Sequence, residues 1–121
     1  MAKSHTLPET SYGELLLLLL RRRKRFKVKG KSMIPLLQPG DEILINSYAY
    51  QRSLPQIGDI VVMMHPQKNR LAIVKRITAI NSDGSYFLTG DNLDASTDSR
   101  DWGTIKLPDI VGKVTSTMQL Q

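Results

Sequence analysis

Residues 28–41 read Val-Lys-Gly-Lys-Ser-Met-Ile-Pro-Leu-Leu-Gln-Pro-Gly-Asp and set a single serine on an irregular stretch of chain. Gly30, two residues before Ser32, allows backbone geometry that a Cβ would forbid. Pro35, three residues after Ser32, fixes φ and removes an amide donor. The segment therefore cannot continue a regular ladder, and we expect Ser32 on an exposed turn. On these residues alone, local hydrogen bonding to the backbone is the favoured role for its hydroxyl.

Short apolar strands separated by turns follow this segment. Gly40-Asp41 and Gly58-Asp59 end two similar turns, each of which opens a strand. Because no helix pattern follows residue 22, the sequence predicts a compact all-β domain with a short N-terminal helix. The expected strands cover residues 26–28, 42–46, 60–64, 71–80, 85–89 and 110–114, and residues 90–103 are expected to form a structured loop. We expect a tail and helix at 1–25 and the β-domain at 26–121.

The N-terminal part carries the strongest contrast of apolar and charged residues. We expect residues 1–10 to be frayed, with Ser11 capping a helix and Glu14 completing a capping box. The six leucines at 15–20 span about 9 Å of helix, far less than the roughly 20 apolar residues that cross a membrane. Packing of this helix on the domain is the preferred interpretation. The alternative is peripheral membrane contact through Leu15–Arg25.

Composition limits the classes of site. The chain has 121 residues and a net charge of +6, and eight of its 17 Lys and Arg residues lie within residues 21–31. The absence of cysteine excludes disulfides and thiolate metal sites and fits a reducing compartment such as the cytoplasm. His5 and His65 have no co-ligand spacing, so we expect neither a metal site nor a cofactor. The basic block lacks regularly interleaved aromatic residues, and we expect no nucleic-acid partner.

Lys75 interrupts an apolar strand pattern. Strand side chains alternate between faces, so Lys75 shares its face with Ile73 and Ile77. Burial disfavours the ammonium and lowers a lysine pKa, and a neutral lysine near a turn-borne serine can act as a general base. A lysine at a sheet edge would instead extend its amine to solvent.

A polar loop at 90–103 forms the third constellation, Gly-Asp-Asn-Leu-Asp-Ala-Ser-Thr-Asp-Ser-Arg-Asp-Trp-Gly. It lacks the full EF-hand ligand pattern, although Asp91, Asn92 and Asp94 leave cation binding open as an alternative. Arg100 can instead tie the loop to the sheet through ion pairs.

These segments, in this order, resemble the type I signal peptidase family of Ser/Lys proteases, whose catalytic β-domain is shared with self-cleaving repressors. The matching boxes are Gly30–Pro35, Gly58–Val62, Val74–Arg76 and the Gly-Asp-Asn…Ser-x-Asp-Ser-Arg pattern at 90–100. The resemblance spans roughly residues 26–115. It implies that Ser32 is the nucleophile on a turn shaped by Gly30 and Met33, and that Lys75 is the general base. It also implies that Ser96 orients Lys75. The residues that stabilise the loop at 90–103 would be Asp91, Asn92, Asp98 and Arg100.

The resemblance also implies a substrate class. Small size and the expected lack of a membrane anchor are similar to compact family members that mature nickel superoxide dismutase. This implies a serine endopeptidase that removes the N-terminal propeptide of a specific precursor in the cytoplasm or at the cytoplasmic face of a membrane. The alternative is a membrane-recruited signal peptidase that cleaves secretory signal peptides. A serine that supplies a second oxyanion donor in some relatives is replaced here by Gly30.

Overall fold

The computed structural model describes residues 7–118, and its elements are mostly β-strands. The strands are β1 (Lys24–Lys27), β2 (Glu42–Asn46), β3 (Ile60–Met64), β4 (Ala72–Ile80), β5 (Tyr86–Thr89) and β6 (Ile110–Met118). The helical elements are α1 (Tyr12–Leu19), α2 (Ser99–Trp102) and the 3₁₀ turns η2 (Leu93–Ala95) and η3 (Leu107–Asp109).

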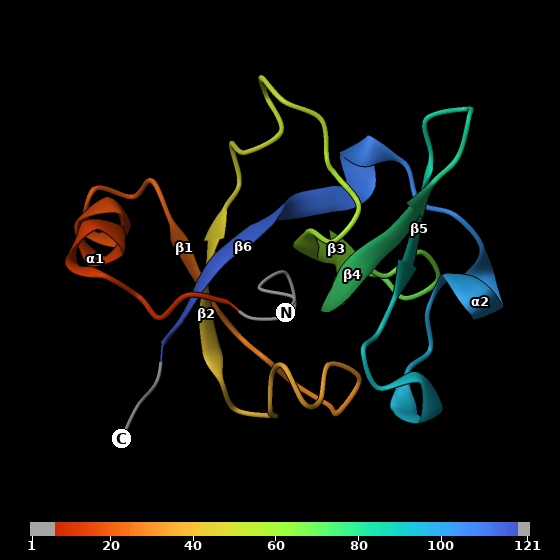
Figure 1. Ribbon diagram of the computed structural model, residues 1–121, viewed down its shortest axis with the longest axis horizontal. Helices are drawn as coiled ribbons and strands as arrows, with labels where there is room; N and C mark the ends of the chain where they lie inside the picture. The colour runs from red at the N-terminus through yellow and green to blue at the C-terminus, as the bar shows by residue number, and fades with distance from the viewer. Residues whose placement is uncertain (1–6, 119–121) are drawn as a thin grey trace.

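One antiparallel sheet joins all six strands in the order β1-β2-β6-β3-β4-β5. The hairpins β3–β4 and β4–β5 are consecutive in the chain, whereas β6 returns from the C-terminal part to lie between β2 and β3 (Figure 1). The predicted all-β fold with a short N-terminal helix is confirmed. Strands at 42–46 and 60–64 have the predicted bounds.

Both faces of β3 are buried, which explains its unbroken apolar sequence. Ile60 and Val62 join a core cluster with residues of the Ser32 segment, while Val61 and Met63 join a second cluster with β4 and β5. The first cluster also contains Val28, Met33, Leu37, Ile43, Ile45, Val74 and Val114. Because Met33 and Leu37 are part of it, packing of the core fixes the serine-bearing turn to the sheet.

The two Gly-Asp turns have the same construction. Gly40 and Gly58 adopt φ angles of 95° and 97°, in the left-handed region that favours glycine. In each turn the aspartate carboxylate accepts a hydrogen bond from the backbone N–H three residues earlier, at Gln38 for Asp41 and at Gln56 for Asp59. The repeated local sequence therefore produces a repeated local structure.

Two sequence predictions in the C-terminal part were wrong. The last strand continues to Met118, because Ser116 and Thr117 pair with β2 even though they are polar. The statement that no helix follows residue 22 also fails, since α2 forms at 99–102. Its capping box joins Asp98 and Asp101, which satisfies the first amides of a helix too short to show an apolar period.

The N-terminal part departs further from expectation. Glu9 forms a parallel bridge with Thr117, and Thr117 N–H donates to Pro8 O, so residues 8–10 are paired rather than frayed. Residues 1–6, including His5, lie outside the described residues. Ser11 caps α1 by accepting from Glu14 N–H, but the Glu14 carboxylate binds Arg23 and Thr115 instead of completing the capping box.

The leucine helix packs on the domain only in part, with Leu15, Leu17 and Leu18 half-buried. No residue of α1 is buried, and Leu16 and Leu19 are 56% and 79% exposed. The helix lies beside the β1–β2 edge of the sheet, at the left of Figure 1. Among residues 7–118, no helix is long and apolar enough to cross a bilayer.

Candidate active site

Ser32 lies half-buried on the turn between β1 and β2. Gly30 has a φ of 79°, so the turn uses the conformational freedom that the sequence predicts for that position. Val28 N–H donates to Asp41 O and Gly40 N–H donates to Val28 O, which closes the base of the loop. Met33 is 1% exposed and holds the residue after the serine in the core.

Lys75 occupies the middle of β4, between β3 and β5 rather than at an edge. It is 4% exposed, and its Nζ donates to Ser96 Oγ at 3.1 Å. Burial lowers the pKa of the Lys75 amine, the Asp98 carboxylate opposes this shift, and the Arg100 guanidinium adds to it. The neutral amine is therefore favoured relative to an exposed lysine.

Asp98 orders the hydroxyl that contacts Lys75. Ser96 Oγ donates to Asp98 Oδ2 at 2.6 Å, and Gly90 N–H donates to the same oxygen at 2.9 Å. Arg100 Nε donates to Asp98 Oδ1 at 2.9 Å. Although burial alone would raise the pKa of this fully buried carboxyl, its hydrogen bonds from Arg100, Ser96 and Gly90 lower the pKa to about 2. Asp98 is thus a fixed anion that accepts a hydrogen bond from the Ser96 hydroxyl, and the Ser96 oxygen is left to accept a hydrogen bond from Lys75.

Gly90 is where the serine turn and the lysine network meet. A Cβ at this position would lie 2.4 Å from Ser96 Oγ and 2.6 Å from Ser32 O, so both atoms adjoin one small space. Asn92 N–H donates to Ser32 O at 2.8 Å, and Asn92 Nδ2 donates to Lys31 O. The folded chain therefore brings Ser32 beside Ser96, the residue that binds Lys75. In the sequence, 42 residues lie between Ser32 and Lys75.

Further contacts hold the 90–103 loop on the sheet. Arg76 donates from Nε and Nη2 to the two oxygens of Asp91, at 2.8 and 2.9 Å, and from Nη1 to Gly58 O. Arg100 Nη2 also donates to the carbonyls of Leu93 and Ser96. Because Arg76 occupies both Asp91 oxygens, the cation-binding alternative for this loop loses a principal ligand.

Family comparison gives the site a context. A model described as "Signal peptidase, peptidase S26" matches residues 13–83 and 82–119. The chain belongs to the peptidase S26 family. A serine-type peptidase is therefore the supported enzyme class for this S26 domain.

Three relatives illustrate the range of similar proteins. Signal peptidase I of Buchnera aphidicola subsp. Baizongia pistaciae is 36% identical over 70 residues, which are 48% of this chain and 23% of the relative. The mitochondrial ATP-independent inner membrane protease subunit 1a of Arabidopsis thaliana is 31% identical over 108 residues, covering 71% of this chain and 64% of the relative. Probable signal peptidase I-1 of Synechocystis is 26% identical over 128 residues, with 70% and 65% covered. The S26 domain thus spans less than two-thirds of the length of each.

Sequence reasoning overlooked two structural contributors to this S26 domain. Ser99 is 3% exposed, and its Oγ accepts from Leu88 N–H, which joins α2 to β5. Asn46, Tyr48 and Arg52 line a hollow at the other end of β2. The Arg and Tyr residues in the polar connection after β2 were visible in the sequence, but no local pattern indicated that they face the start of β1.

Proposed function

We propose that this S26 domain is an endopeptidase with a Ser/Lys dyad, in which Ser32 is the nucleophile and Lys75 the general base. The observation that supports it most directly is a buried amine, with a lowered pKa, joined through Ser96 and Gly90 to the serine turn. The Lys75 Nζ takes the proton as Ser32 Oγ bonds to the peptide carbonyl carbon. The amine then gives that proton to the leaving nitrogen, and water cleaves the acyl-serine ester.

Ser96 and Asp98 are positioning residues in this proposal. A neutral amine has two N–H donors and one lone pair, and the hydrogen bond to Ser96 uses one donor. Because the Ser96 hydrogen is directed to Asp98, Ser96 does not compete with Ser32 for the lone pair. The lone pair is then free to accept the Ser32 hydroxyl proton.

The backbone of the serine turn supplies the proposed oxyanion donor. Within residues 7–118, the Ser32 N–H donates no hydrogen bond to the protein. Donors aimed at a developing oxyanion typically contribute about 3–4 kcal/mol to catalysis. The open side of Gly30, where a Cβ would meet no atom of residues 7–118 within 4 Å, leaves room for substrate beside this donor.

For the substrate, we propose the N-terminal propeptide of a specific precursor, with a nickel-containing superoxide dismutase precursor as the first choice. The support is the resemblance of this chain's boxes and size to the compact maturation proteases, and the cytoplasm is the proposed compartment. Broader cleavage of signal peptides at a membrane is the second candidate. The names of the relatives favour it, as do the exposed leucines of α1.

Co-expression with candidate precursors tests mechanism and substrate separately. Wild type is expected to cut the nickel superoxide dismutase precursor once, while Ser32→Ala and Lys75→Ala leave it intact in a folded state verified by circular dichroism. Ser53→Ala, on the exposed β2–β3 connection, serves as a matched control and should cut normally. Normal cleavage by folded Ser32→Ala would refute the dyad. Cleavage of a secretory precursor but not of the dismutase precursor would replace the substrate while keeping the dyad.

A further inference from the structure

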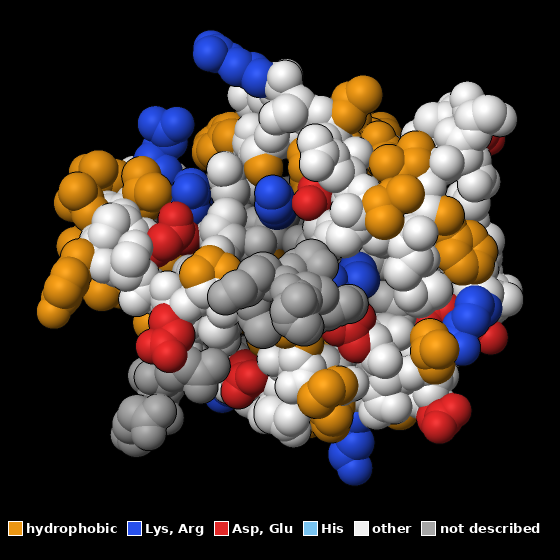
Figure 2. Space-filling model, viewed as in Figure 1, with side chains coloured by type: hydrophobic (Ala, Val, Ile, Leu, Met, Phe, Trp, Pro, Cys, Tyr) orange, Lys and Arg blue, Asp and Glu red, His pale blue; other side chains and the backbone are white. Residues whose placement is uncertain are grey.

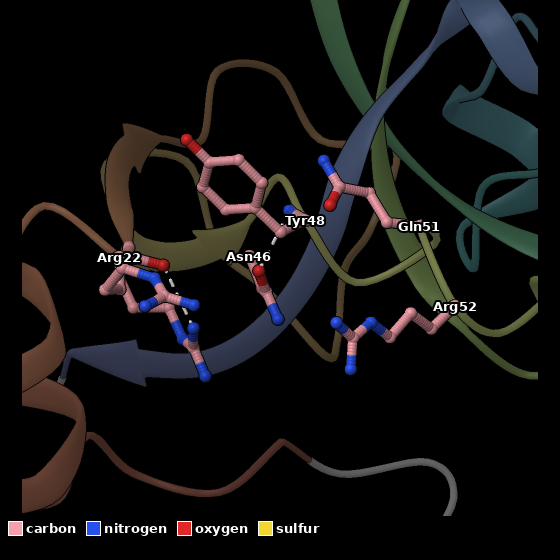
Figure 3. Close-up of a pocket in the computed structure, with 6 residues that line it drawn as sticks. Arg22, Asn46, Tyr48, Gln51 and Arg52 are labelled. Carbon is pink, nitrogen blue, oxygen red and sulfur yellow. Dashed lines mark hydrogen bonds between the residues drawn. The ribbon is translucent and has the colours of Figure 1, made fainter.

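A basic hollow of about 560 Å³ lies between the start of β1 and the β2–β3 connection. Its lining residues are Arg22, Arg23, Asn46, Tyr48, Gln51 and Arg52. Figure 3 shows Arg52 extending from the connection back toward Asn46, with Arg22 and Tyr48 on the facing side. Among residues 7–118, three guanidinium groups and no carboxylate line the hollow, so its charge suits an anion with several oxygen acceptors.

Two of the three arginines are available for such an anion. Arg23 pairs with Glu14 at 3.2 Å, whereas Arg22 and Arg52 have no acidic partner among residues 7–118. The Arg22 guanidinium lies 5.8 Å from the centre of the Tyr48 ring, a cation–π contact that positions the side chain without neutralising it. Both arginines are exposed, so an external ligand can reach them.

Exposed leucines shortly precede two arginines of this hollow, Arg22 and Arg23, in the chain. Leu16, Leu19 and Leu20 are 56%, 79% and 60% exposed, and the chain passes directly from Leu20 into the arginines. Figure 2 shows the hydrophobic side chains of α1 standing out at the left margin with cations beside them. Apolar side chains next to unpaired cations match the boundary between acyl chains and anionic head groups.

Glu14 fixes which side of α1 faces outward. Its carboxylate accepts from Thr115 Oγ1 at 2.6 Å on β6 and from Arg23 Nε at 3.2 Å at the start of β1. These bonds hold the polar side of the helix against the sheet. The outer leucines are thus presented to the surroundings by a specific polar anchor.

We propose that this surface docks on a membrane containing anionic phospholipid. The leucine–arginine end, defined as Leu16, Leu19, Leu20, Arg22 and Arg52, binds the bilayer. Arg22 and Arg52 hold a lipid phosphate, and the three leucines enter the acyl boundary. Coupling a charged pocket to an apolar ridge selects a lipid over a soluble anion, because a soluble anion leaves the leucines in water.

The proposed orientation directs the Ser32 turn away from the lipid. β2 begins after that turn at Glu42 and ends beside the hollow at Asn46, a separation of roughly 13 Å along the strand. A domain seated on its leucine–arginine end would therefore present Ser32 to the aqueous side. This inference is independent of the proposed dyad, since it concerns the opposite end of β2.

Vesicle flotation of the full chain tests the docking directly. We expect binding to vesicles of phosphatidylcholine with 30% phosphatidylglycerol at low salt, and much weaker binding to phosphatidylcholine alone. Arg22→Glu/Arg52→Glu should lower the partition coefficient roughly tenfold or more, and Leu16→Ser/Leu19→Ser should do the same. The matched control Lys68→Glu/Arg70→Glu reverses two exposed charges elsewhere and should bind within about twofold of wild type.

Three outcomes would overturn the proposal. The first is equal loss of vesicle binding in the control and pocket variants, which would indicate nonspecific charge. The second is pocket-dependent binding of inorganic phosphate in calorimetry with no vesicle binding, which would indicate a soluble anion site. The third is a concentration-dependent dimer that only the leucine variant abolishes, again with no vesicle binding, which would assign the leucines to a second copy of the chain.

Single cysteines test the orientation, because the chain contains none. Leu19→Cys and Leu93→Cys replace leucines that are 79% and 54% exposed, in α1 at the left of Figure 1 and in η2 at its lower right. An environment-sensitive fluorophore at Leu19→Cys should shift to the blue with anionic vesicles, while one at Leu93→Cys should not. A blue shift at Leu93→Cys alone would reverse the proposed orientation.

Discussion

Charged side chains are buried near one end of β2 and exposed near the other. At the Ser32 end, comprising Ser32, Lys75, Ser96 and Asp98, the lysine and the aspartate are 4% and 0% exposed. At the leucine–arginine end, Arg22 and Arg52 are exposed and lack acidic partners among the described residues. Burial at the first end shifts pKa values and fixes rotamers, whereas exposure at the second leaves full charges for an outside partner. The proposed chemistry and the proposed docking therefore place opposite demands on the same sheet.

Replacing Lys75 should give the largest change. Lys75→Met is expected to reduce kcat/KM at least about a thousandfold, because the proposed dyad then has no base for the serine proton. Its stability should rise at neutral pH, since methionine has no charge to desolvate. Peptide cleavage assays and urea denaturation measure the two effects. Loss of activity with a large loss of stability would assign Lys75 a structural role instead.

The pH dependence sharpens this prediction. Burial lowers the Lys75 pKa in the folded state, so the unfolded state binds more protons between the folded-state pKa and the ordinary value of 10.5. Stability of the wild type should therefore rise with pH across that window, and the advantage of Lys75→Met should be greatest below it. Activity should increase with pH as the amine deprotonates. Parallel stability curves for the two proteins would contradict a desolvated Lys75.

Gly90→Ala tests whether the Ser32 end depends on the close approach of Gly90 to Ser32 and Ser96. The new Cβ would meet Ser96 Oγ at 2.4 Å and Ser32 O at 2.6 Å, which forces the serine turn away from the Lys75 network. We expect about a hundredfold loss of kcat/KM without removal of any reacting group. Gly13→Ala is the matched control, because its Cβ would meet only Ser11 Oγ at 3.6 Å. It should retain activity and gain up to about 1 kcal/mol from helix propensity. Equal activity in both variants would remove Gly90 from the site.

Asp98→Asn removes the anion of the Ser32 end while keeping its shape. Lowering of the Asp98 pKa from 3.8 to about 2 corresponds to about 2 kcal/mol of stability. That contribution is present above the unfolded-state pKa and disappears as the pH falls through the folded-state value. We expect Asp98→Asn to lose this amount at pH 7, and to unfold with less acid dependence than wild type. Thermal unfolding of both proteins at pH 7 and pH 3 provides the measurement. If Asp98→Asn lost as much stability between pH 7 and pH 3 as wild type does, the prediction would be contradicted.

Local features of the Ser32 end were predictable from the sequence. Gly40 and Gly58 lie in matching Gly-Asp turns, and both adopt the positive φ that such turns require. Alternation along 71–77 predicted that Lys75 shares a buried face with Ile77, and both are buried. Capping of α2 by Asp98 was also encoded locally, through Asp98 and Asp101, but four residues give too little apolar period to reveal a helix.

Long-range features were beyond such reasoning. Pairing of β6 between β2 and β3 depends on contacts across the whole chain, and it carries Ser116 and Thr117 into buried positions. The hollow at the leucine–arginine end forms only where Arg22 and Arg52 meet from separate segments. Packing of α1 was predicted from its leucines alone. The structure bears this out only in part, because the leucines are half-buried or exposed and the polar attachment runs from Glu14 to Thr115 and Arg23.

The smallest expected effect completes the comparison. Arg22→Glu/Arg52→Glu changes four units of charge, yet within the described range 7–118 neither arginine has an acidic partner, and both are exposed. Stability should change by no more than about 0.5 kcal/mol, as at other exposed positions, and kcat/KM on a soluble peptide should stay within about twofold. Denaturation and a membrane-free cleavage assay check both. A tenfold loss of activity in that assay would mean that the two ends are coupled through β2, and the separation of chemistry from docking would have to be abandoned.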